Sequence, residues 1–218
     1  GGGYIALEFA GILNGLGVNT TLSYRGTQLL KHFDADLGQR ILSESESHGI
    51  SVMMGSQISA ITRSDDDQLR VSFQDGSQAS YGMVLYATGR NPATNAIGLE
   101  NTKVETRTNG EIVVDDYFQT AEPTVFALGD IIGTPALTPV ALAQGMAFVD
   151  SWYRDQRRTV DYDNIATAVF CSPNIATVGL SEERARERYT DIDVYESEFR
   201  HLKHTLSGNS ERTYMKLV

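Results

Sequence analysis

Residues 1–24 read GGGYIALEFAGILNGLGVNTTLSY, a glycine cluster followed by an apolar helical pattern and then by a β-branched strand. Gly1, Gly3 and Ala6 have the spacing G-x-G-x-x-G/A, in which the small residues allow a tight turn and close approach of a pyrophosphate. A flexible glycine-rich terminus is the alternative, but a helix directly after glycines and then a strand is the context that this pattern requires. We therefore predict the phosphate-binding turn of a βαβ unit whose first strand is missing, with the anion on the helix N-terminus.

A pair of cations follows the strand, at the place where such units choose their cofactor. NAD-binding units usually carry Asp or Glu here to bind the ribose 2′-hydroxyl. Tyr24 stands at the strand end instead, Arg25 follows it, and Lys31 comes later in the same loop. No acid occurs between Gly17 and Asp34. Two ordinary solvated cations are the alternative, but in a chain of net charge −10 the pair favours a 2′-phosphate, and NADPH is expected rather than NADH.

The overall composition is that of an acidic α/β protein. The 218 residues carry 18 lysines and arginines against 28 acidic residues, which argues against nucleic acid or an anionic membrane surface as the main partner. No apolar run approaches the roughly 20 residues of a membrane helix, and no signal peptide is visible. The single cysteine excludes an internal disulfide, and no metal site is predicted. We expect a soluble, cytoplasmic protein.

Patterning along the chain predicts further helices and strands. An antiparallel meander is expected over 57–62, 69–73 and 77–81, and helices over 34–47, 138–154 and 182–188. Further strands are expected at 50–54, 83–87, 125–128, 166–170, 176–178, 194–199 and 213–218, with a hairpin turn at Asn109-Gly110.

The strand predicted before Gly129-Asp130 gives a second nucleotide signal. The glycine admits close backbone approach and the carboxylate accepts hydrogen bonds from sugar-like hydroxyls, although turn chemistry alone also produces Gly-Asp. Four segments, in the family's order, resemble motifs of the flavin-dependent pyridine nucleotide–disulfide oxidoreductases: MVLYATGRNP at 83–92, TAEPTVFALGD at 120–130, LTPVALAQG at 137–145 and VFCSPNIATVGLSE at 169–182.

This resemblance implies a site for NADPH at the start of the chain. Gly1, Gly3 and Ala6 are expected to receive its pyrophosphate, and Arg25 and Lys31 its 2′-phosphate.

The resemblance also implies contacts with FAD. Tyr4 matches an aromatic that covers the flavin until nicotinamide displaces it, with ordinary helix–sheet packing as the alternative. Glu8 matches a glutamate that pairs with a lysine outside this chain; otherwise it is a solvated helix residue. Asp130 is expected to bind the FAD ribitol, and Leu137 and Thr138 to begin a helix whose positive N-terminus faces the flavin. Thr138 also suits the N-cap of that helix. The remaining expected cofactor contacts are Ile5, Gly89 and Gly129.

The implied fold class is α/β, in three parts. A Rossmann-like NADPH-binding domain is expected at 1–92, a returning part of an FAD-binding domain at 93–162, and the beginning of an α+β dimerisation domain at 163–218. The implied protein is a homodimer.

The implied reaction passes the hydride of NADPH through FAD to an active-site disulfide and then to a substrate, expected to be glutathione disulfide. Siblings acting on trypanothione, mercuric ion or dihydrolipoamide are alternatives, and a nucleotide-binding module without activity is another. The family's redox cysteine pair and its His-Pro base are missing from these 218 residues, so we expect the chain alone to be inactive.

Three further side chains are expected to take no part in catalysis. Cys171 lies in an apolar strand and is expected in the core, because the redox pair requires two nearby cysteines. His201 and His204 lie beside Arg200 and Lys203, which predicts a solvated basic stretch.

Overall fold

α1 (Tyr4–Gly15) begins directly after the glycine cluster, as the apolar spacing predicts. Ala6, Leu7 and Ala10 are its buried residues, and they lie on one side because residues three or four positions apart share a helix face. The buried face is narrower than the apolar spacing predicts, because Phe9 and Ile12 are about half exposed.

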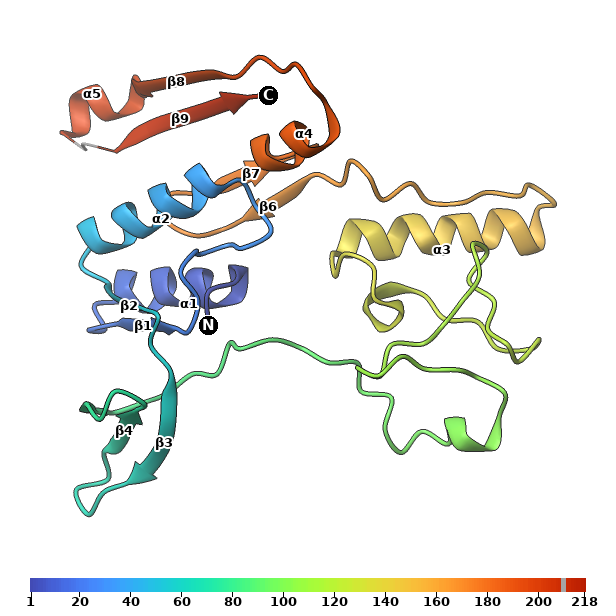
Figure 1. The fold of residues 1–218 in the computed structure, drawn as a ribbon, viewed down its shortest axis with the longest axis horizontal. Coiled ribbons are helices and arrows are strands. Elements are labelled where there is room, and N and C mark those ends of the chain that lie inside the picture. The colour runs from blue at the N-terminus through green and yellow to red at the C-terminus, as the bar shows by residue number, and fades with distance from the viewer. Residues whose placement is uncertain (209–210) are drawn as a thin grey trace. The chain divides into compact units, whose positions relative to one another are not determined.

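A βαβ unit follows α1. β1 (Thr21–Tyr24) and β2 (Ser51–Met54) pair in parallel along their whole length. A parallel pair requires a crossover connection, and α2 (Ala35–Ser47) supplies it (Figure 1). Asp34 caps α2 by accepting a hydrogen bond from the N–H of Asp36 at 3.1 Å. The predicted helix and both predicted strands are therefore confirmed, with ends that differ by one to three residues.

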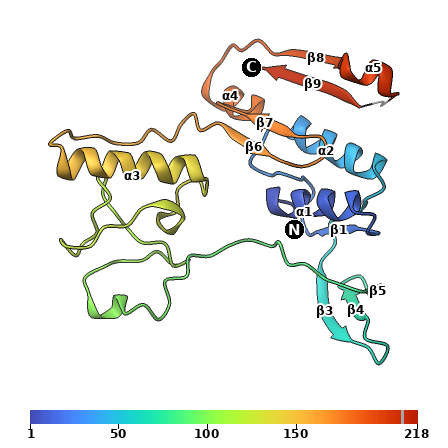
Figure 2. The same cartoon turned by 180° about the vertical axis from the view of Figure 1, so that it is seen from behind.

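The predicted meander is also confirmed (Figure 2). β3 (Ile58–Arg63), β4 (Leu69–Phe73) and β5 (Gln78–Tyr81) form a three-stranded antiparallel sheet in the order β3-β4-β5. Asp67 and Gly76 have positive φ in the two connecting turns, where aspartate and glycine tolerate the left-handed conformation.

The described residues from 166 to the end of the chain form two antiparallel strand pairs and two helices. β6 pairs with β7 and β8 with β9, both antiparallel. The short helix α5 was not predicted, because five residues are too few to show a helical period. The elements are β6 (Thr167–Val169), β7 (Ile175–Thr177), α4 (Glu182–Arg188), β8 (Tyr195–Arg200), α5 (Lys203–Ser207) and β9 (Arg212–Leu217).

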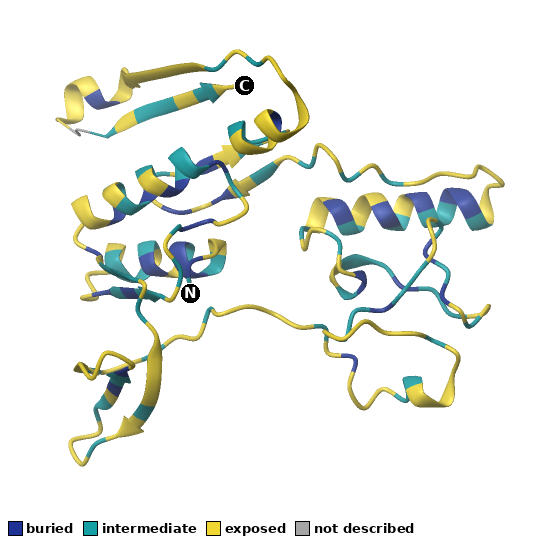
Figure 3. Ribbon diagram, viewed as in Figure 1, coloured by how far each residue is buried: buried dark blue, intermediate teal, exposed yellow. Residues whose placement is uncertain are grey.

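One hydrophobic core joins residues 6–50 to residues 169–175. Figure 3 colours the buried residues of these segments dark blue. Side chains of α1, β1 and α2 pack there with those around β6 and β7. The buried members are Ala6, Leu7, Ala10, Leu22, Leu29, Leu30, Ile41, Ile50, Val169, Cys171 and Ile175.

A second core lies in the middle of the chain, around α3 (Thr138–Tyr153). Two short 3₁₀ helices, η1 (Leu99–Asn101) and η2 (Gly129–Ile132), accompany it, and Thr106 pairs with Ile112 across the predicted turn at Asn109-Gly110. The buried members are Ile112, Phe118, Ala127, Ile132 and Ala147.

The two cores belong to two compact units. This computed structural model describes residues 1–208 and 211–218; residues 1–89 and 166–218 form unit 1, and residues 90–165 form unit 2. Unit 1 thus contains both the βαβ unit and the two carboxyl-terminal hairpins. Among the described residues, no helix has the length and apolarity needed to cross a membrane.

Two predicted strands are wrong. Residues 83–87 have no strand partner in the described chain, and Met83 and Tyr86 are mostly exposed. Residues 125–128 form only one bridge, between Gln119 and Phe126. A strand is defined by hydrogen bonds to a neighbour, so an apolar β-branched sequence alone does not produce one.

Two predicted local roles are also wrong. His204 is buried rather than solvated, since α5 turns it inward, where its ring packs edge-on against His201. Thr138 is not an N-cap: α3 already begins there, and Leu137 takes the extended N-cap conformation. The apolar Leu137 offers no side-chain oxygen, and the structure gives this end no side-chain cap.

Candidate functional site

The backbone of the glycine turn (residues 1–3) lies close to two other groups of unit 1. A Cβ on Gly1 would collide with the carbonyl oxygen of Ala87, and a Cβ on Gly2 would lie 2.6 Å from the ring of Tyr24. The nitrogen of Gly1 donates a hydrogen bond to the carbonyl of Ser23 at 2.7 Å, which holds the turn beside β1. Sequence reasoning missed Gly2, because its constraint comes from a ring that lies far along the chain.

Gly3 faces open space instead. It is the N-cap of α1 in an extended conformation, without a side-chain cap, and a Cβ built on it meets nothing within 4 Å. The N–H groups of the first helical turn, which include those of Ile5 and Ala6, have no partner within the helix. Small Ala6 is buried behind them. This arrangement suits an anion that approaches the backbone closely.

The loop after β1 is fastened to the glycine turn. The N–H of Leu30 donates a hydrogen bond to the carbonyl of Gly2 at 2.8 Å, and the side chains of Leu29 and Leu30 are buried. Leu30 has φ of 51°, a conformation that costs energy for a leucine and that the buried side chains stabilise. Arg25 and Lys31, at either end of this anchored stretch, are exposed and form no ion pair within the described chain. The structure thus brings the predicted cation loop to the predicted phosphate turn.

Tyr4 and Glu8 lie on successive turns of α1. Tyr4 is 37% exposed, so part of the residue is open to solvent. The carboxylate of Glu8 accepts a hydrogen bond from the N–H of Phe170 at 2.8 Å, so Glu8 is not simply a solvated residue. It links α1 to the end of β6. Gly89, with φ of 134°, is exposed two residues beyond Ala87.

The remaining predicted residues lie in unit 2. Gly129 has φ of 79° at the start of η2, and the half-exposed carboxylate of Asp130 lies 3.8 Å from the guanidinium of Arg90. Asp130 is therefore open to a hydroxyl ligand. Leu137 and Thr138 stand at the N-terminus of α3, where Thr138 is exposed.

Gln144 holds the Gly129 turn and was missed by sequence reasoning. Its side chain is fully buried; its oxygen accepts a hydrogen bond from the N–H of Gly129 at 2.5 Å. Its amide nitrogen donates to the hydroxyls of Thr134 and Tyr162 at 2.8 and 2.9 Å. The only available signal was a polar residue on the buried face of an apolar helix.

Cys171 is confirmed as a core residue. It is buried, and its thiol lies 3.1 Å from the carbonyl of Pro173. Burial raises the pKa of this thiol to about 11, so it is not an activated nucleophile. The described residues include no cluster of ligands for a metal ion.

Comparison with protein families gives two matches that cover most of the chain. Residues 1–145 match the model described as pyridine nucleotide-disulphide oxidoreductase, and residues 165–218 match the dimerisation domain of the same family. The chain belongs to this family. Members of the pyridine nucleotide-disulphide oxidoreductase family use FAD and NAD(P)H.

Several relatives within the family are similar over the whole chain. Glutathione reductases of Burkholderia cepacia and Pisum sativum (chloroplastic/mitochondrial) are each 40% identical over 218 residues. Trypanothione reductase of Trypanosoma congolense is 35% identical over 221 residues. All of this chain is matched in each case, against 48%, 40% and 45% of the relative. The chain therefore spans less than half the length of these three relatives.

A solved structure agrees with the fold. The HOCl-induced flavoprotein disulfide reductase RclA from Escherichia coli matches with a TM-score of 0.88 at 26% identity, covering 99% of this chain and 49% of that one.

Proposed function

We propose that this chain is part of an FAD-dependent NADPH:disulfide reductase whose substrate is glutathione disulfide. The observation that carries the proposal is the hydrogen bond from Leu30 to Gly2, which fastens the loop of Arg25 and Lys31 to an uncapped helix N-terminus. Two exposed cations without a carboxylate beside a phosphate turn suit a 2′-phosphorylated nucleotide. The names of the most similar relatives support glutathione disulfide as the substrate.

In this proposal each predicted residue has one task. Gly1, Gly3, Ile5 and Ala6 bind the pyrophosphate of NADPH, and Gly89 borders the same nucleotide. Tyr4 shields the flavin, which when bound carries two electrons from NADPH to a disulfide. Glu8 accepts a hydrogen bond from the N–H of Phe170, and its carboxylate would pair with a lysine outside this chain. Asp130, with Gly129, would accept hydrogen bonds from the FAD ribitol, and the N-terminus of α3 at Leu137 and Thr138 would stabilise negative charge on the flavin.

The proposed domain plan follows the predicted boundaries. Residues 1–92 bind NADPH, 93–162 contribute to the FAD-binding domain, and 163–218 begin the dimerisation domain of a cytoplasmic homodimer.

Arg25 and Lys31 provide the first test. The double variant Arg25→Ala/Lys31→Ala in the full-length protein should lower kcat/KM for NADPH at least about 100-fold, because each of the two lost charge-assisted hydrogen bonds contributes about 1.5–3 kcal/mol. The kcat/KM for NADH should stay unchanged. Arg70→Ala, which removes an exposed arginine from β4, is the matched control. Faster turnover of the unchanged protein with NADH than with NADPH would overturn the cofactor proposal.

A trypanothione-specific enzyme is the second candidate, because trypanothione reductases at 35–36% identity also match nearly the whole chain. Steady-state assays with glutathione disulfide and trypanothione disulfide as separate substrates distinguish the two. We expect turnover of glutathione disulfide; failure to reduce it would reject the proposed substrate.

A further inference from the structure

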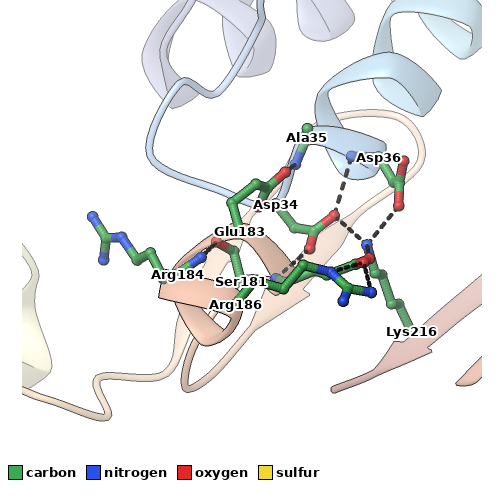
Figure 4. A network of polar contacts seen from close by, with 9 residues as sticks. Asp34, Ala35, Asp36, Ser181, Glu183, Arg184, Arg186 and Lys216 are labelled. Atoms are coloured by element: carbon green, nitrogen blue, oxygen red, sulfur yellow. Dashed lines mark hydrogen bonds and ion pairs between the residues drawn. The ribbon is translucent and has the colours of Figure 1, made fainter. Parts of the chain in front are cut away.

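A buried lysine connects the end of the chain to the loop of the proposed nucleotide site. Lys216, in β9, has a side chain only 7% exposed, and its ammonium group contacts three carboxylates. The distances are 2.6 Å to Asp36, 2.7 Å to Glu182 and 3.0 Å to Asp34 (Figure 4). All four side chains belong to unit 1. A buried lysine is stable only when its charge is matched in this way.

Asp34 is the centre of this contact. One of its carboxylate oxygens accepts hydrogen bonds from Lys216 and from the N–H of Asp36, and the other accepts from the N–H of Glu182 at 3.0 Å. It therefore caps α2 and also binds the first residue of α4. Glu183 completes the junction by accepting a hydrogen bond from the N–H of Ala35 at 3.1 Å.

The charged forms of these groups are strongly favoured. Burial by itself would raise the pKa of Asp34, but hydrogen bonds from the N–H of Glu182 and from Lys216 outweigh it and lower that pKa. Burial likewise opposes the charge of Lys216, but its hydrogen bonds to Asp36, Glu182 and Asp34 raise the pKa of the ammonium group. The junction is thus charged throughout the neutral pH range.

Backbone hydrogen bonds link this junction to the proposed site. Asp34 follows Phe33, whose N–H donates to the carbonyl of Leu30 at 2.7 Å. Leu30 in turn donates to the carbonyl of Gly2 at 2.8 Å. The loop that carries Lys31 is therefore fixed at one end by the glycine turn and at the other by Asp34.

We propose that Lys216 is a positioning residue for recognition of the nucleotide 2′-phosphate, acting by fixing Asp34 and hence the loop that carries Lys31. The proposal rests on the proposed NADPH function. It differs from a purely structural role in one respect: loss of Lys216 should weaken only ligands that carry the 2′-phosphate.

The test compares two probes, adenosine 2′,5′-bisphosphate and 5′-AMP, in calorimetric titrations of the full-length, FAD-loaded protein. Lys216→Met should bind the bisphosphate about tenfold more weakly and 5′-AMP with unchanged affinity. In assays it should raise KM for NADPH with little change in kcat. Lys216→Arg keeps the charge and should restore most of the discrimination. Lys203→Met removes an exposed lysine from α5 and is the matched control.

Removing one partner of a buried ion pair can unfold a protein, so Asp36→Asn is the second variant. The Asp36 side chain is 48% exposed, and Asp34 and Glu182 remain to balance Lys216. We expect a smaller loss of the same kind, about threefold, with the fold intact by circular dichroism.

Each other outcome has a definite meaning. If Lys216→Met loses affinity for both probes equally, or for neither, Lys216 is not a positioning residue. If Lys216→Met does not fold, the same two outcomes for Asp36→Asn lead to the same conclusion. If the unchanged protein itself binds both probes equally, the NADPH proposal fails and this one fails with it. The unchanged protein therefore distinguishes the two failures.

Discussion

The side-chain amide of Gln144 is fully buried, and both its oxygen and its nitrogen are hydrogen-bonded. The oxygen accepts from the N–H of Gly129, and the nitrogen donates to two hydroxyls. Gln144→Leu has similar volume but leaves those groups without a partner. Each unsatisfied buried group costs about 1–3 kcal/mol, so we expect a clear fall in the free energy of unfolding of unit 2. Trp152, the single tryptophan, lies in unit 2 and reports this unfolding in urea by its fluorescence. Gln156→Leu, an exposed position, is the control; equal urea midpoints for both variants would contradict the prediction.

The thiol of Cys171 gives a prediction about pH. Burial raises its pKa to about 11, so only about a thousandth of the Cys171 side chains are thiolate at pH 8. The thiolate fraction becomes large only as the pH approaches 11. Iodoacetamide at pH 8 should therefore leave the folded 218-residue chain unmodified and alkylate it readily in urea. Mass spectrometry measures both. Equal labelling rates in the two conditions would show that Cys171 is accessible in the folded state.

At the scale of an element, α1 offers a position, Gly3, at which a substitution should change NADPH binding without changing stability. Gly3 has φ of −91°, and a Cβ there meets no atom, so Gly3→Ala should leave the free energy of unfolding within about 0.5 kcal/mol of the unchanged chain. The added methyl group would occupy the space that we assign to the pyrophosphate, so affinity for NADPH should fall at least tenfold. Gly15→Ala, at the other end of α1, is the control and should not change the affinity. Unchanged NADPH binding by Gly3→Ala would place the pyrophosphate elsewhere.

Helices and strands could be predicted from the sequence where adjacent residues determine them. The helix pattern after the glycines and the alternating pattern of the meander each depend on a few adjacent side chains, and those elements are present. Residues 83–87 have the composition of a strand, but strand formation depends on a partner that local sequence does not contain. The contact between Asp34 and Lys216 spans 182 positions and follows from tertiary packing alone.

At the scale of the whole molecule, the family's chemistry needs more thiols than this chain has. Reduction of a disulfide by exchange requires a thiolate to attack and a second thiol to resolve the mixed disulfide. The 218 residues contain one cysteine, Cys171, which is buried and carries a raised pKa. The loop of Arg25 and Lys31, which we propose binds the nucleotide, is by contrast anchored to the glycine turn.

We therefore expect the isolated 218-residue chain to bind NADPH and to reduce no disulfide. Calorimetry with NADPH measures the first, and NADPH consumption in the presence of added FAD and glutathione disulfide measures the second. The Arg25→Ala/Lys31→Ala variant of the same chain controls for nonspecific binding. Because formation of a mixed disulfide by the single thiol releases one glutathione and consumes no NADPH, any NADPH consumption that depends on glutathione disulfide would show that reduction follows a route without a cysteine pair. Binding without turnover would assign to these residues the recognition of the reductant, separate from the thiol chemistry that the family performs.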